Sequence, residues 1–289
     1  MASSPVMFNP FAAKTIGGHL LQLQPRNFSG DLHGKLFPFF AGVSSATSRA
    51  LLLDYDGTIA PFRSDRNRAY PYPAVLDLLK RIRTFTHTRL VLVTGRRALD
   101  AVQLLGIKRV EVWGCHGLER LHIDGTYEMP QIAERSLQTI SLAHERLARE
   151  GLRDLMEYKP AGIAIHWRGM EPETASAIRR KVEAVWSRLP DTRGLCLLKF
   201  DGGMEIHATA RNKGDVVRAV VTETANRGSI AYLGDDLTDE DAFAALQGYG
   251  LSVLVRSEYR PTLADVWIRP PEGVVEFLTD WIRACGGES

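Results

Sequence analysis

Short, wholly apolar runs alternate with amphipathic segments along this chain, and the alternation predicts a layered α/β fold. Residues 51–53 are all leucine, and residues 230–233 carry only aliphatic and aromatic side chains, as expected for strands that are buried on both faces of a parallel sheet. Residues 74–85 instead place apolar side chains at helical spacing. Strands and helices that follow one another in this way are typical of βαβ units. The same rhythm predicts strands at 89–93, 110–113 and 251–255, and helices at 35–46, after 97, from Lys213, at 239–246 and at 274–284.

The rhythm changes between residues 118 and 208. There the pattern predicts a long polar helix at 131–149, a second helix at 173–189, and strands near 155–158, 162–167, 195–200 and 204–208. Strands joined by short turns, with two helices among them, indicate a small α+β layer inserted into the parallel-sheet domain. We therefore expect a Rossmann-like parallel-sheet core at 50–117 and 209–289, an α+β cap domain at 118–208, and a partly irregular N-terminal extension at 1–49.

Composition and charge narrow the class of protein. The 289 residues are 45% hydrophobic, and 36 Lys and Arg against 34 Asp and Glu give a formal net charge of +2 without runs of like charge. This balance gives no indication of a nucleic-acid-binding surface, so no nucleic-acid partner is expected. No segment approaches the roughly 18 consecutive apolar residues of a spanning helix, so no membrane partner is expected. We expect a monomer.

The cysteines and the N-terminal segment are the parts of the sequence that indicate where in the cell the protein is located. Three widely spaced cysteines favour a reducing, cytoplasmic setting over a disulfide framework. No acidic residue precedes Asp31. A transit peptide and a plain extension are both compatible with such a segment.

Candidate chemistry begins where the first predicted core strand ends. Asp54 and Asp56 follow the apolar run, and Gly57 and Thr58 come next. In open α/β sheets, ligands bind beyond the carboxyl ends of the strands. Two carboxylates held on one side of a strand end repel each other unless a cation or a shared proton intervenes, which favours a hard metal such as Mg²⁺. An ordinary Asp-Gly turn is the alternative.

Two further strand ends carry polar residues. Thr94 follows the strand at 89–93 and could bind a phosphoryl oxygen, or it could cap the next helix. After 230–233 come five carboxylates between residues 235 and 241. Thr238 is predicted to cap the following helix with Asp241 in the capping-box position. That role leaves Asp235 and Asp236 unexplained at the strand end.

Residues outside these strand ends have less specific patterns. His116 lies between two glycines, where it could contact a ligand or be an ordinary loop histidine. Glu157 and Lys159 alternate on a predicted cap strand. A solvated strand face would show the same spacing.

The ordered set of motifs resembles the haloacid dehalogenase-like phosphatases. Asp54-Tyr55-Asp56-Gly57-Thr58, Thr94, Lys213 and the acidic segment from Gly234 to Asp239 correspond to the four motifs of that superfamily, and together they cover residues 51–255. Within the superfamily, three further segments look like those of trehalose-6-phosphate phosphatases. These are Gly-Asp-Asp-x-Thr-Asp-Glu-Asp-Ala-Phe at 234–243, Gly-x-His-Gly at 114–117, and Glu157-x-Lys159 with His166-x-Arg168.

The resemblance implies a role for each matching residue. Asp54 would be the nucleophile, Asp56 the general acid and base, and Thr94 and Lys213 the phosphoryl-binding residues. Mg²⁺ would lie between the Asp54 carboxylate, the main-chain carbonyl of Asp56 and Asp235, with Asp236 or Asp239 holding its waters. The substrate would contact Thr58, Arg96, His116, Gly117, Glu157, Lys159, Arg168 and Glu205. The family commonly continues its Glu-Ile pair with Arg-Pro, whereas this chain has His207-Ala208 after Glu205-Ile206.

The function that follows from the resemblance is Mg²⁺-dependent hydrolysis of trehalose 6-phosphate through an aspartyl-phosphate. The expected partner is therefore a small sugar phosphate. Three other functions stay open at this point: a phosphatase for another sugar phosphate, a phosphomutase that returns the phosphoryl group to sugar, and a phosphosugar sensor without turnover.

Overall fold

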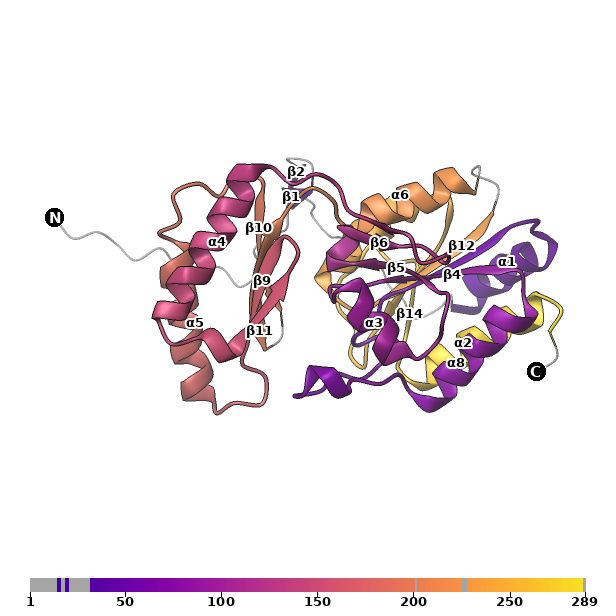
Figure 1. Ribbon diagram of the computed structural model, residues 1–289. Helices are drawn as coiled ribbons and strands as arrows, with labels where there is room; N and C mark the ends of the chain where they lie inside the picture. Colours follow the sequence, from indigo (N-terminus) through magenta and orange to yellow (C-terminus); the bar gives the residue numbers. More distant parts are fainter. Residues whose placement is uncertain (1–14, 17–18, 21–31, 201, 225–227, 288–289) are drawn as a thin grey trace.

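A parallel-sheet core and a smaller cap make up the structure (Figure 1). The computed structural model describes residues 15–16, 19–20, 32–200, 202–224 and 228–287. Much of the predicted N-terminal extension lies outside these residues. Within it, Thr15–Ile16 and His19–Leu20 pair as the antiparallel strands β1 and β2.

The core sheet has eight strands in the order β14-β13-β12-β3-β4-β5-β6-β7. The strands from β14 to β5 are parallel, and β6 and β7 add an antiparallel hairpin. In chain order the bounds are β3 (Arg49–Leu53), β4 (Thr88–Val93), β5 (Glu111–Gly114), β6 (Glu119–Leu121), β7 (Tyr127–Glu128), β12 (Ser229–Gly234), β13 (Gly250–Val255) and β14 (Val266–Ile268).

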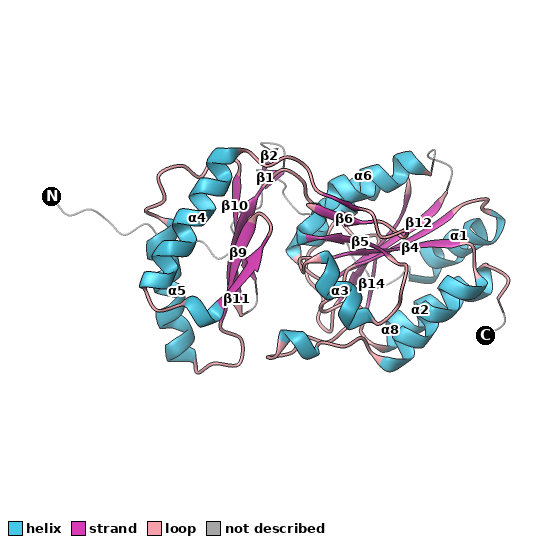
Figure 2. Ribbon diagram, viewed as in Figure 1, coloured by secondary structure: helices cyan, strands magenta, loops and turns pink. Residues whose placement is uncertain are grey.

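Helices cover both faces of this sheet (Figure 2). Leu51 and Leu53 of β3 pack in the apolar cluster under one set of helices, whereas Leu52 belongs to the cluster under α6 and α7. Side chains along a strand point alternately to the two faces, so a central strand covered on both sides needs an unbroken apolar run. The core helices are α1 (Leu32–Ser45), α2 (Pro73–Phe85), α3 (Ala98–Leu105), α6 (Lys213–Glu223), α7 (Glu240–Leu246) and α8 (Glu272–Ala284).

The cap is an antiparallel sheet covered on one face by two helices. Its strands have the order β10-β11-β9-β8, and α4 and α5 pack against the face that is turned away from the core (Figure 2). The opposite face of the sheet is directed at the core. The bounds are α4 (Glu134–Arg149), β8 (Met156–Lys159), β9 (Gly162–His166), α5 (Pro172–Trp186), β10 (Leu195–Phe200) and β11 (Gly203–Ala208).

Strand alternation decides which cap residues face the core. In β11, Met204 and Ile206 pack in the cap's own apolar cluster, so Glu205 between them points the other way. In β8, Glu157 lies opposite Ala164 of β9 in the antiparallel register and shares that core-facing side. The cap therefore presents charged side chains to the core and apolar side chains to its helices.

Most predicted elements are present within a few residues of their expected bounds, and three features differ. The β6–β7 hairpin extends the core sheet past residue 118, where the predicted cap begins, and the three-residue strand β14 was not expected. Leu99 is exposed, because α3 buries Ala98 and Ala101 instead. In the part of the chain that the structure describes, no helix has the length and apolarity needed to cross a bilayer.

Trp281 gives a test of the core packing. Its side chain is fully buried in α8, and its indole N–H donates to Thr88 Oγ1 at 3.0 Å. Trp281→Ala should lower the free energy of unfolding by about 3–5 kcal/mol, because it leaves a large cavity. Urea denaturation measures this loss. Phe85→Ala, at an exposed position in α2, is the control and should change stability by less than about 0.5 kcal/mol. A loss below about 1 kcal/mol for Trp281→Ala would contradict the packing described.

Candidate active site

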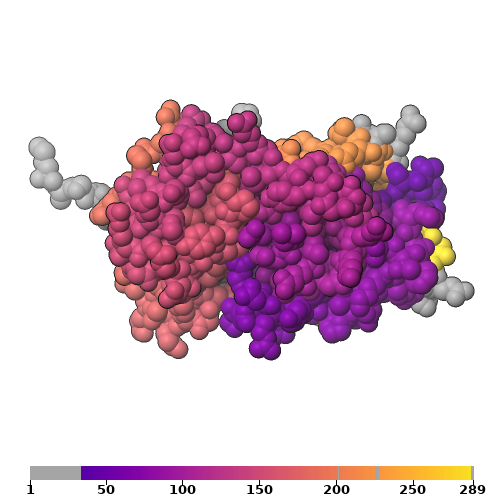
Figure 3. Space-filling model, viewed as in Figure 1, coloured from indigo at the N-terminus to yellow at the C-terminus, as the bar shows by residue number. Residues whose placement is uncertain are grey.

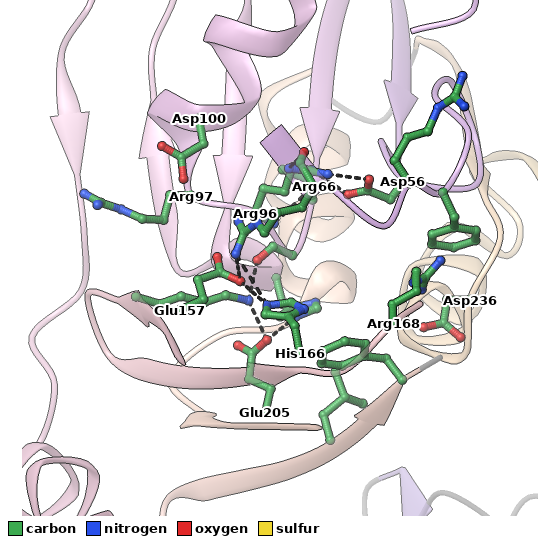
Figure 4. A pocket seen from close by; sticks show the side chains of 18 of the residues that line it. Asp56, Arg66, Arg96, Arg97, Asp100, Glu157, His166, Arg168, Glu205 and Asp236 are labelled. Atoms are coloured by element: carbon green, nitrogen blue, oxygen red, sulfur yellow. Dashed lines mark hydrogen bonds and ion pairs between the residues drawn. The ribbon is translucent and has the colours of Figure 1, made fainter. Parts of the chain in front are cut away.

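Most of the predicted site residues meet in a cavity between the carboxyl ends of the core strands and the cap sheet. The cavity has a volume of about 630 Å³. Asp54 and Asp56 follow β3, and Thr94 and Arg96 follow β4. Eight further predicted site residues from the core and the cap also line the cavity, several of which Figure 4 labels. These are His116, Glu157, Lys159, Arg168, Glu205, Lys213, Asp235 and Asp236.

Asp54 is held in place by two donors. The Lys213 ammonium donates to Asp54 Oδ1 at 2.7 Å, and the Thr58 hydroxyl donates to Oδ2 at 3.2 Å. Lys213 is the first residue of α6, which is anchored by a capping box between Asn212 and Asp215. Thr58 is fully buried and supports Asp54 from outside the cavity lining. The carboxylate is thereby fixed at the strand end.

The capping of the acidic segment differs from the prediction. Asp236, not Thr238, is the N-cap of the one-turn helix η4 (Leu237–Asp239), and Asp239, not Asp241, completes the capping box. The buried Asp239 also accepts hydrogen bonds from Lys213 Nζ at 2.7 Å and from the Tyr232 hydroxyl at 2.6 Å. The sequence prediction missed this cap because the short helix precedes α7.

The buried carboxylates carry more negative charge than the protein balances. Oxygens of Asp54, Asp235 and Asp239 lie within 4.8 Å of one another, and Lys213 is their only ion-pair partner in the described part of the chain. Burial raises the pKa of Asp54 to about 7 against the opposing effect of Lys213. Burial and the neighbouring acids also raise the pKa of Asp235 well above its usual range. An oxygen-rich cluster that lacks counter-charge fits a hard divalent cation such as Mg²⁺.

Asp56 is oriented by a different cation. The Arg96 guanidinium binds it in a fork, with Nε to Oδ2 at 2.6 Å and Nη2 to Oδ1 at 2.7 Å (Figure 4). Gly57 then turns with φ +83°, and a Cβ there would lie 2.3 Å from Asp235 Oδ2. Only glycine permits this approach. The two aspartates of the first motif are thus paired separately, Asp54 with Lys213 and Asp56 with Arg96.

Thr94 is buried and does not cap α3. Its hydroxyl accepts a hydrogen bond from Arg96 N at 3.1 Å, and the N-cap of α3 is Arg97, which makes no side-chain capping bond. The His116 ring lies over Gly95, where an added Cβ would approach it to 2.6 Å. Gly117 lies outside the cavity lining, close to Val216 of α6.

The cap residues contact the core directly. Lys159 Nζ donates to Gly95 O at 2.7 Å and to Glu205 Oε2 at 2.5 Å, and the same oxygen lies 3.6 Å from His116 Nε2. Glu205 is buried, yet Lys159 and His116 hold its pKa well below the usual range. His207, which departs from the motif described in the sequence analysis, lies beside His116 with ring centroids 5.3 Å apart.

Sequence patterns did not identify every residue of this interface. The Arg66 side chain forms an ion pair with Glu157, and the Arg168 guanidinium lies 4.3 Å from the centre of the Phe62 ring. His166 also contacts Glu157, with Nε2 2.8 Å from Oε2. Arg66 and Phe62 belong to a core loop whose composition has no distinctive spacing, so only the fold brings them to the cap.

The fold is that of haloacid dehalogenase-like hydrolases. The structure is similar to a haloacid dehalogenase-like hydrolase from *B. subtilis*, with a TM-score of 0.54 and 16% identity over 80% of this chain and 99% of that one. A family model described as trehalose-phosphatase matches residues 52–264. The chain belongs to the trehalose-phosphatase family.

Similar proteins agree with this assignment. A trehalose-phosphate phosphatase of Mycobacterium tuberculosis is 27% identical in an alignment of 248 residues that covers 80% of this chain and 61% of the relative. A *Mycobacterium leprae* relative with the same name is also 27% identical, over 81% of this chain and 57% of its own length. The chain thus spans about three fifths of these relatives. The *C. albicans* trehalose-6-phosphate phosphatase C-terminal domain shares the fold, with a TM-score of 0.71 and 19% identity over 88% of this chain and 97% of that one.

The acidic cluster predicts a pH-dependent stabilisation by Mg²⁺. In metal-free protein, the folded state keeps the Asp54 proton up to a pKa of about 7, whereas the unfolded chain releases it near 3.8. Stability from this group is therefore full below pH 3.8 and falls as pH rises toward 7. Because Mg²⁺ binds the ionised carboxylates, it should raise the unfolding temperature more at pH 8 than at pH 5.

Differential scanning fluorimetry after EDTA treatment, with and without added Mg²⁺ at matched ionic strength, measures this difference. Asp235→Asn should reduce the Mg²⁺-dependent increase at pH 8, because the amide carries no negative charge. An increase in unfolding temperature that is the same at both pH values would contradict a cation site made of these carboxylates.

Proposed function

We propose that this protein hydrolyses trehalose 6-phosphate to trehalose and inorganic phosphate. The observation that carries the proposal is the separate pairing of the two strand-end aspartates within one cavity. Asp54 is fixed by Lys213, and Asp56 is oriented by Arg96, so that one carboxylate is placed to attack and the other to transfer protons. Membership of the trehalose-phosphatase family supports the choice of substrate.

The first chemical step uses Asp54 as the nucleophile. One of its carboxylate oxygens forms a bond to phosphorus while the bond from phosphorus to the sugar oxygen breaks. Asp56 enters this step in its protonated form and gives its proton to the departing sugar oxygen, and trehalose is released. Lys213 and Thr94 line the cavity beside Asp54, where they would bind the phosphoryl oxygens and offset the charge that develops on them.

The second step returns the enzyme to its starting state. Asp56, now ionised, accepts a proton from a water molecule, and the water oxygen attacks the phosphorus of the aspartyl-phosphate. The bond between phosphorus and the Asp54 oxygen breaks and phosphate leaves. Both carboxyl groups then have the charge with which they began.

Mg²⁺ would bind at the acidic cluster, with Asp54, Asp235 and the main-chain carbonyl of Asp56 as its protein ligands. Both Asp239 oxygens already accept hydrogen bonds, from Lys213, Tyr232 and Asp236 N, so Asp239, or Asp236 beside it, would act through bound waters. When bound, the ion supplies the positive charge that this cluster lacks and so favours negative charge on the phosphoryl group.

The cap supplies acceptors suited to a sugar. Glu157 Oε1 and Glu205 Oε1 are buried and have no hydrogen-bond partner among the described residues, although the second oxygen of each carboxylate is paired. Despite burial, Lys159 and the neighbouring His166 and Arg66 lower the pKa of Glu157 to about 2, so it is an ionised acceptor at neutral pH. Such oxygens bind sugar hydroxyls through directional, charge-assisted hydrogen bonds.

We also propose that the protein is located in the cytoplasm. Cys115 and Cys285 form no disulfide, and burial raises the pKa of both thiols, that of Cys115 well above its usual range. Buried thiols in an unreactive protonated form are typical of a reducing compartment.

Asp54→Asn tests the nucleophile and the reaction together. The amide has nearly the same shape but cannot form the acyl-phosphate, so phosphate release from trehalose 6-phosphate should fall to less than about a hundredth of the wild-type rate. A phosphate-release assay across a panel of sugar phosphates makes the measurement, with circular dichroism as the folding control. Higher residual activity in protein free of deamidated asparagine would rule out Asp54. Faster wild-type release from another sugar phosphate would overturn the proposed substrate.

Glu157→Ala tests sugar recognition by the cap. Loss of one charge-assisted hydrogen bond should lower kcat/KM for trehalose 6-phosphate roughly 10- to 150-fold. Hydrolysis of p-nitrophenyl phosphate should change little, because this small ester does not reach the cap. Equal proportional losses on both esters would show instead that Glu157 supports the fold or the core site.

A further inference from the structure

The loop at residues 63–69 links the core to the cap through Arg66. This arginine begins the one-turn helix η1 (Arg66–Arg68), which is capped by Asp65, whose carboxylate accepts a hydrogen bond from Asn67 N at 3.0 Å. In Figure 1 this short indigo segment projects from the core toward the cap sheet. Because the Asp65 side chain caps this helix and restricts the turn to few conformations, the main chain of Arg66 has a defined position.

The main-chain carbonyl of Arg66 takes part in the pairing of Asp56. Arg96 Nη1 donates to Arg66 O at 2.8 Å, while Nε and Nη2 of the same guanidinium bind the two carboxylate oxygens of Asp56. Arg96 is buried, and its planar fork has little freedom once these acceptors are engaged. The position of the Asp56 carboxylate therefore depends on where the Arg66 carbonyl lies.

The side chain of Arg66 extends to the cap. Its Nη1 pairs with Glu157 Oε2 on β8 and lies 3.4 Å from His166 Nε2 on β9 (Figure 4). Glu157 Oε1 keeps no partner among the residues that the structure describes. One oxygen of this carboxylate thus binds the core, and the other is left for a donor in the cavity.

We propose that Arg66 is a positioning residue that joins the cap carboxylate Glu157 to the Arg96–Asp56 pair. A sugar bound to Glu157 Oε1 would then hold the cap, the Arg66 loop and Asp56 in one arrangement. The inference rests on the proposed function, because it concerns how sugar binding reaches the residue that transfers protons. It adds a specific role for a residue whose sequence context gave no signal.

Arg66→Ala separates the two ends of this link. The substitution removes the contact to Glu157 but keeps the main-chain carbonyl that Arg96 binds. For trehalose 6-phosphate, kcat/KM should fall roughly 10- to 100-fold, with part of the loss in kcat, because sugar contacts no longer align Asp56. For p-nitrophenyl phosphate, kcat/KM should stay within about twofold of wild type, because this ester makes no cap contact.

Arg68→Ala is the matched control. Arg68 is an exposed arginine in the same one-turn helix, so Arg68→Ala removes the same charge from the loop but leaves the contact between Arg66 and Glu157 in place. This variant should keep wild-type rates on both esters. Arg66→Lys, which retains a charge within reach of Glu157, should recover part of the lost kcat.

A double-mutant cycle decides whether Arg66 acts through Glu157. If it does, the double variant Arg66→Ala with Glu157→Ala should lose no more kcat/KM on trehalose 6-phosphate than the worse single variant. Additive losses, equal losses on both esters, or a match between Arg66→Ala and Arg68→Ala would each overturn the inference. Failure of the proposed function would be seen in the wild type, which would then release no phosphate from trehalose 6-phosphate.

Discussion

The rest of the site depends on the balance of charge around Lys213. Its buried ammonium bridges Asp54 and Asp239, 2.7 Å from an oxygen of each, and so joins the first strand of the core to the acidic segment after β12. These acids keep the pKa of Lys213 above its usual range although burial opposes this. One cation cannot neutralise three carboxylates. The remaining negative charge is what makes this strand edge suited to a divalent cation.

The core and the cap contribute charged residues to the cavity from opposite sides, and the two parts lie in contact in the space-filling view (Figure 3). The parallel sheet brings the ends of β3, β4 and β12 to one edge, where their polar residues face the cap. The cap sheet alternates, with apolar side chains toward α4 and α5 and charged side chains toward the core. Because each sheet has one face or edge committed to polar groups, the cavity between them is strongly polar. Its buried ion pairs, such as Lys213 with Asp54, are stronger than the same pairs would be in water.

Sequence periodicity predicted the strands and helices whose side-chain pattern follows directly from which face is buried. The unbroken leucines of β3, the helical spacing of α2 and the strand at 195–200 were found because burial on known faces dictates their periodicity. The β6–β7 hairpin was missed, since strands of two or three residues at a sheet edge have too few side chains to show a period. The Thr238 cap was wrong for a related reason. Asp236 and Thr238 are both good capping residues, and the extra turn η4 decided between them.

The sequence alone determined the chemistry of this protein: the order of its strand-end acids, the lysine that opens α6, and the α/β core that brings them together. These features are local in the chain, or they follow from the rule that parallel strands end at a common edge. Only the tertiary structure decided the pairing. Asp56 is bound by Arg96, 40 residues away, and Glu157 by Arg66, a residue of another lobe. Ion-pair partners depend on distances between elements that are far apart in sequence, and no periodicity along the chain records those distances.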